Sequence, residues 1–87
     1  MTTANTDLAT STDWIDLVAT YSGLASVSAW VQNKAPNDLV VVFSASGTAP
    51  ATAMGYLLAR GAQVTGSAAH IWVKSIGGAG VVGCGLA

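Results

Sequence analysis

The stretch Ile71-Trp72-Val73-Lys74-Ser75 decides the fold of this 87-residue chain. Side chains alternate along it, so that Ile71 and Val73 face one side of a β-strand and Trp72 the other. The glycine-rich segment 77–80 follows and leads into the apolar run from Val81 to Leu86. This order predicts a hairpin that closes the fold, with a loop longer than two residues.

Other segments of the chain show the same kind of pattern. Alternation predicts a strand from Ala25 to Asn33, and the β-branched run Leu39–Phe43 predicts a strand that is covered on both faces. A turn is expected at 34–38, where Pro36 has no N–H for a ladder. Shorter strands are expected at Asp13–Val18, Gly55–Ala59 and Val64–Gly66. At the first of these, Ser11, Thr12 or Asp13 alternatively caps a single helical turn.

A shift of 42 positions lays Trp30-Val31 over Trp72-Val73 and the turn 34–38 over residues 76–80. If the two halves are alike, two similar hairpins are related by a pseudo-two-fold. The predicted fold is all-β, a small antiparallel β-sandwich or flattened barrel of about six strands. Residues 1–12 contain few apolar side chains and are expected to form a flexible N-terminal arm. Residues 13–87 form a single β domain in this reading.

The composition favours association with other protein surfaces. Hydrophobic residues make up 52% of the chain and charged residues 8%, whereas soluble domains typically carry about 25% charged residues. With a single cysteine, no disulfide within the chain is available to stabilise so small a core. A homo-oligomer or larger assembly is therefore expected, and a monomer with a surface of small neutral residues is the alternative.

Several function classes have no support in the sequence. The net charge of −1 gives no electrostatic footprint for nucleic acid. The longest apolar run, Leu39–Phe43, is far below the roughly 20 residues of a spanning helix, and no signal peptide is recognisable, which suggests synthesis in a cytoplasm. The chain has no glutamate and no Gly-x-Ser-x-Gly pattern. With one His and one Cys, a metal cluster is not expected, so no enzymatic activity and no cofactor are predicted.

Tryptophans on the polar face of strands are candidates for contacts. A tryptophan there anchors a protein interface, belongs to a second core, or stacks on a sugar ring. His70 is expected to be a hydrogen-bonding surface or interface residue, and Cys84 a buried thiol without a catalytic role. The candidate interface residues are Trp14, Trp30, Val40, Val42, His70, Trp72 and Lys74.

Three segments carry a family resemblance: Asp13-Trp14-Ile15-Asp16-Leu17, the Gly-x-Leu-Leu-Ala-x-Gly-like Gly55–Gly61, and Ile71-Trp72-Val73-Lys74-Ser75 with the valine strand after it. In this layout the chain resembles small structural proteins of tailed bacteriophage virions. The resemblance implies binding without catalysis, as a capsid decoration (cement) protein, often trimeric, whose partners are the major capsid protein or other virion proteins. A tail- or fibre-associated component, or a glycan-binding module of a fibre, is the alternative. The expected location is the virion.

Overall fold

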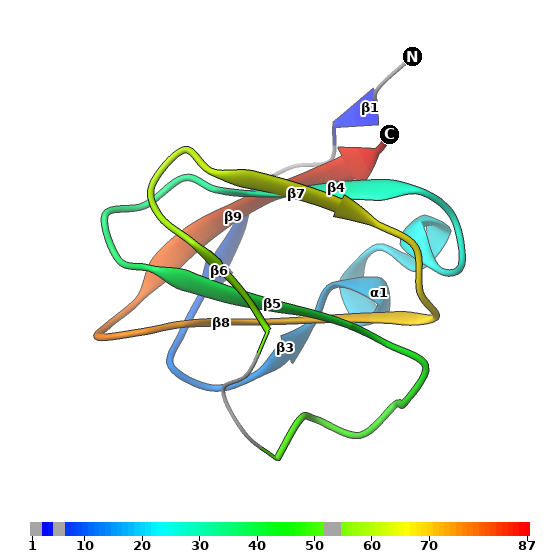
Figure 1. Ribbon diagram of the computed structural model, residues 1–87, viewed down its shortest axis with the longest axis horizontal. Helices are drawn as coiled ribbons and strands as arrows, with labels where there is room; N and C mark the ends of the chain where they lie inside the picture. The colour runs from blue at the N-terminus through cyan, green and yellow to red at the C-terminus, as the bar shows by residue number, and fades with distance from the viewer. Residues whose placement is uncertain (1–2, 5–6, 52–54) are drawn as a thin grey trace.

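Two antiparallel sheets face each other as the two layers of the fold (Figure 1). The computed structural model describes residues 3–4, 7–51 and 55–87. In sheet A the strands run in the order β1-β9-β4-β7, with β2 also beside β9, and sheet B has the order β3-β8-β5-β6. Sheet A comprises β1 (Thr3–Ala4), β2 (Leu8–Thr10), β4 (Ala29–Asn33), β7 (Gln63–Gly66) and β9 (Gly80–Leu86). Sheet B comprises β3 (Ile15–Asp16), β5 (Leu39–Ser44), β6 (Tyr56–Leu58) and β8 (His70–Ser75).

This architecture confirms the prediction of a small all-β antiparallel sandwich. The described part of the chain contains nine strands, more than expected. The strands not expected are the short β1 and β2, which lie in the segment predicted to be a flexible arm.

The core lies where alternate residues of the central strands point inward. Val31 on β4, Val41 on β5, Val73 on β8 and Cys84 on β9 are fully buried. Complete burial of a valine-sized side chain contributes about 1.5–3 kcal/mol to folding. The inward rows are therefore the main source of stability, and they place Cys84 in the buried position expected for it.

The two predicted hairpins are wrong, because each connection passes from one sheet to the other. β4 lies in sheet A and β5 in sheet B, while β8 lies in sheet B and β9 in sheet A. β4 pairs with β9, and β5 pairs with β8. The connections 34–38 and 76–79 are thus two arches, and each strand of one arch pairs with a strand of the other arch rather than with its own arch partner.

The predicted pseudo-two-fold survives in this arrangement. Exchanging β4 with β8 and β5 with β9 converts one pairing into the other, so the interlocked arches are equivalent in topology. The backbone bonds that lock them are equivalent too: Lys34 N donates to Val81 O at 3.0 Å, and Ile76 N donates to Asp38 O at 2.9 Å. The second arch is one residue shorter, which accounts for a one-residue offset between the two pairing registers.

The expected flexible arm pairs with β9 of its own chain within its described residues. Thr3 lies opposite Leu86, and Leu8 opposite Val82. Leu8 packs against the core, and Asp7 forms an ion pair with Lys34 at 3.0 Å. Backbone pairing and one inward leucine therefore fix this segment without a neighbouring subunit. Residues 1–2 and 5–6 lie outside the described part.

Two element boundaries differ from the sequence prediction for local reasons. The segment Asp13–Val18 is a strand only at Ile15–Asp16, after which helix α1 (Leu17–Thr20) begins. Its N-cap is Asp16, whose carboxylate accepts from Val18 N at 3.0 Å, as N-caps do. The strand expected from Ala25 begins at Ala29, because Ser26 has a φ of 58° and interrupts the extended backbone after the 3₁₀ turn Ser22–Leu24.

Candidate interaction surface

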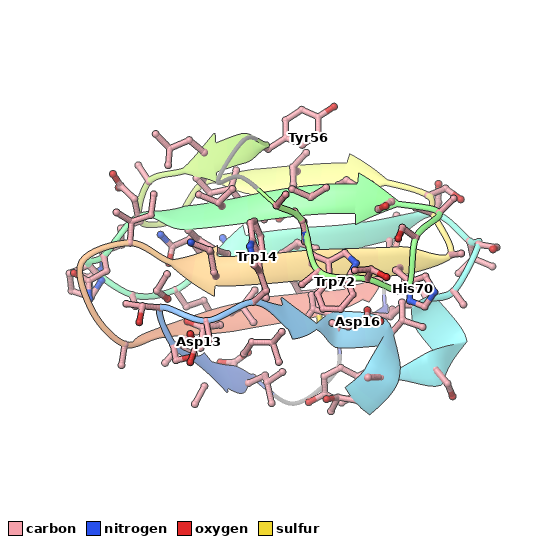
Figure 2. All side chains as sticks on the ribbon, turned by 90° about the horizontal axis from the view of Figure 1, so that it is seen from below. Asp13, Trp14, Asp16, Tyr56, His70 and Trp72 are labelled. Atoms are coloured by element: carbon pink, nitrogen blue, oxygen red, sulfur yellow. The ribbon has the colours of Figure 1, made fainter. Side chains whose placement is uncertain are left out.

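The outward face of sheet B carries most of the predicted interface residues. On β5 and β8, Val40 lies opposite Lys74 and Val42 opposite Trp72, on the face opposite to the core residues Val41 and Val73. Figure 2 views this face, with Trp14, Trp72 and His70 lying along it. The structure thus brings together Trp14, Val40, Val42, His70, Trp72 and Lys74. Trp30 lies on the outward face of sheet A, on the other side of the sandwich.

One row of side chains runs across sheet B, from the residue before β3 through β8 and β5 to β6, and we call it the cross-strand row: Trp14, Lys74, Val40 and Leu57. Lys74 pairs with Val40, and Val40 pairs with Leu57. At one end, Lys74 Nζ lies 5.2 Å from the centroid of the Trp14 ring, a cation–π geometry. Val40 is 1% exposed in the middle of the row, whereas Leu57 at the other end is 62% exposed. The accessible parts of the row are therefore Trp14, Lys74 and Leu57.

Trp72 is a covered residue rather than an open platform. It is 9% exposed, and its indole N–H donates to the carbonyl oxygen of Ser46 at 3.1 Å. The segment after β5 thus folds back over this face at Ser46. Of the alternatives for Trp72, the second core fits its burial.

His70 and Asp16 form a pair at the edge of this face (Figure 2). The imidazole Nδ1 lies 2.6 Å from one carboxylate oxygen of Asp16. The other carboxylate oxygen accepts from Val18 N at 3.0 Å and from Ile71 N at 3.3 Å. Asp16 therefore caps α1 and connects β3 to β8, and the pair holds elements together that are distant in sequence.

The surroundings of the His70–Asp16 pair bear on its chemistry. Stacking with the Trp72 ring, at 6.4 Å between centroids, further orients the imidazole. Within the described residues, no serine or threonine hydroxyl is hydrogen-bonded to the imidazole, so no nucleophile–base pair is formed there. The same residues contain no cluster of three or more His, Cys, Asp or Glu side chains able to hold a metal ion. The geometry supports a positioning role for His70.

Sequence reasoning did not identify Asp16 as the partner of His70. An aspartate before Leu17-Val18 carries an N-cap signal, but the 54 positions between the two residues hide their contact. Leu57 was also missed as the exposed end of the cross-strand row. Its signal would have been a leucine at an outward strand position, which requires the pairing register of β6 to be known.

Trp30 is half-buried on sheet A, between Thr65 of β7 and Gly85 of β9. Its indole nitrogen is buried and has no hydrogen-bond partner among the described residues. Because Trp30 lies on sheet A, it does not share a surface with the candidates on sheet B.

No protein-family model matches the chain, and no curated protein or solved structure matches it either. None of the helices in the described residues is long and apolar enough to cross a membrane.

Proposed function

We propose that this chain is a non-enzymatic structural protein of a tailed-bacteriophage virion, and specifically a capsid decoration protein that binds and stabilises the assembled shell. The resemblance in the segments around Asp13–Leu17, Gly55–Gly61 and Ile71–Ser75 supports the class of protein. The low charge supports a protein that is bound to other proteins, because 8% charged residues leave much of the surface neutral. A ligand that binds only the assembled shell stabilises it by mass action.

The cross-strand row is the observation that carries the proposal. It presents an aromatic ring, an aliphatic side chain and one cation around a buried valine, on a face formed by rigid strands. Interfaces combine an apolar and aromatic centre with a polar rim, and tryptophan is enriched among the residues that dominate binding. We propose that Trp14 and Leu57 contact the major capsid protein or another virion protein. Self-association, as the trimer implied by the resemblance, is part of the proposal.

Electron microscopy of particles assembled with and without the protein tests the role. We expect density on the capsid lattice and a shell that resists heat less well when the protein is missing. Equally resistant shells without the protein would contradict the cement role, and density on the tail would assign it to a tail or fibre component. Light scattering of the isolated protein tests self-association, which a strictly monomeric mass at all concentrations would exclude.

A matched pair of variants tests the surface. Trp14→Ala combined with Leu57→Ala is expected to lower the affinity for shells by about thirtyfold, the effect of losing about 2 kcal/mol at an interface centre. Val81→Ala is the control, because Val81 is 36% exposed on sheet A, away from the cross-strand row. Equal loss in both variants would show that the row is not the contact.

A further inference from the structure

A cleft opens at the edge of the sandwich, between β5 and β6 of sheet B and the end of β7 of sheet A. Its volume is about 360 Å³, and its lining includes Phe43, Gly55, Tyr56, Thr65, Gly66 and Ser67. Clefts that bind small ligands in proteins span roughly 300–1,000 Å³. Figure 2 shows Tyr56 projecting from this edge, away from the surface of Trp14 and Trp72. The cleft is thus separate from the cross-strand row.

The aromatic wall of the cleft is held in place from within. The rings of Phe43 and Tyr56 meet edge to face, with centroids 6.2 Å apart and planes at 73°. Phe43 lies in turn against Gly66, where an added Cβ would stand 2.9 Å from the ring. Tyr56 remains 58% exposed. A fixed but accessible aromatic ring is available for stacking.

The β7 side of the cleft is polar but carries no charge. Ser67, directly after β7, is exposed and supplies a hydroxyl, whereas Thr65 lines the cleft from a strand position that faces outward from sheet A together with Trp30. None of the lining residues is charged. A phosphate or carboxylate ligand would lack a cation to bind it, whereas a neutral ligand with many hydroxyls finds both hydrogen-bonding groups and an apolar ring face.

We propose that this cleft binds one ring of a neutral saccharide, which stacks on Tyr56 and hydrogen-bonds to the hydroxyl of Ser67. A sugar ring has an apolar face of C–H groups and an edge of hydroxyls, and these two features match the two walls. The glycan alternative predicted for a tryptophan thus moves from Trp72, whose ring is covered, to the cleft. The proposal goes beyond the decoration role and does not depend on it.

Saturation-transfer NMR on the full chain tests the site, with neutral oligosaccharides of glucose, galactose and mannose as probes and sialylated oligosaccharides as the charged comparison. We expect transfer to at least one neutral probe. Tyr56→Ala should weaken its binding about tenfold, and Tyr56→Phe should retain most of it, because the ring supplies the stacking. Ser67→Ala should weaken binding by a smaller factor.

Leu57→Ala is the matched control, since Leu57 is the exposed neighbour on the opposite face of β6. It should leave saccharide binding unchanged and affect only shell binding, while Tyr56→Ala should do the reverse. Far-UV circular dichroism verifies that each variant is folded. The proposal is overturned if no neutral probe gives transfer at millimolar concentration, if sialylated probes bind equally well, or if folded Tyr56→Ala binds as the parent does.

Discussion

The hydrogen bond between Thr10 and Ser75 offers a direct test of how the N-terminal segment is held. The two hydroxyl oxygens lie 2.5 Å apart and join β2 of sheet A to β8 of sheet B. Thr10 is 4% exposed and Ser75 2% exposed, so water does not replace the bond. Gly80 leaves the room for it, because an added Cβ would stand 2.7 Å from Ser75 Oγ and 2.9 Å from Thr10 Oγ1.

Ser75→Ala leaves the hydroxyl of Thr10 buried and unpaired, which costs about 1–3 kcal/mol. Thr10→Val has the same effect on Ser75 and keeps the shape of the side chain. An 87-residue domain has a free energy of unfolding of about 4–13 kcal/mol, so either variant remains folded. Each kcal/mol lost from the free energy of unfolding lowers the melting temperature by about 4–8 °C for a domain of this size. In the double variant both polar groups are gone, and the cost falls well below the sum of the single costs.

Urea unfolding of the four proteins, followed by tryptophan fluorescence, measures this coupling as a double-mutant cycle. We expect an interaction energy of about 1 kcal/mol or more between the two sites. Single costs that add to within about 0.5 kcal/mol would refute the reasoning, because they would mean that Thr10 is not seated against β8. An unchanged m-value is the check that both states remain comparable.

Substitutions at three further sites test other contacts, with control variants beside them. Asn33→Ala should lower the free energy of unfolding by about 3 kcal/mol, because the buried side chain donates to two carbonyls and accepts one N–H, and a parent-like urea midpoint would contradict this. Gly66→Ala should cost about 1–3 kcal/mol by crowding Phe43. Gly23→Ala, with open space around it, is the control in thermal melts. Asp16→Ala should lower the free energy of unfolding by about 1 kcal/mol through loss of the helix cap, and further through loss of the contact with His70. Asp16→Asn keeps the cap. Equal melting temperatures for these two Asp16 variants would assign the whole effect to His70.

The strands were largely readable from the sequence because the central strands turn a row of apolar residues toward the core, as alternation or a run of β-branched residues indicates. Ala29–Asn33, Leu39–Ser44 and His70–Ser75 lie where the pattern placed them, within a few residues. The boundary at Ala25 was missed because the left-handed backbone of Ser26 leaves no mark in an alternating pattern. The inward orientation of Val31 and Val73 also follows from the alternation along their strands.

The connections were not readable, since a loop of four or five residues serves a hairpin as well as an arch. The arch is selected by partners far away in sequence. Asn37 Nδ2, in the first arch, donates to Ala79 O in the second at 2.8 Å. For the same reason the grouping of Trp14, Lys74 and Leu57 on one surface, and the cleft beside Tyr56, appear only once the strands are paired.

The interlocked arches have a consequence for how the chain reaches this structure. No strand pairs with the strand that follows it across either arch, and even the pairing of β5 with β6 spans a long loop. Such non-local topologies fold slowly, over milliseconds to seconds. Among the described strands, β9 comes after all eight others in the sequence. Even so, β1, β2 and β4 each pair with it. While the chain is being synthesised, these strands leave the ribosome with unpaired edges, and the interval before Gly80–Leu86 emerges is when the protein is most exposed to aggregation.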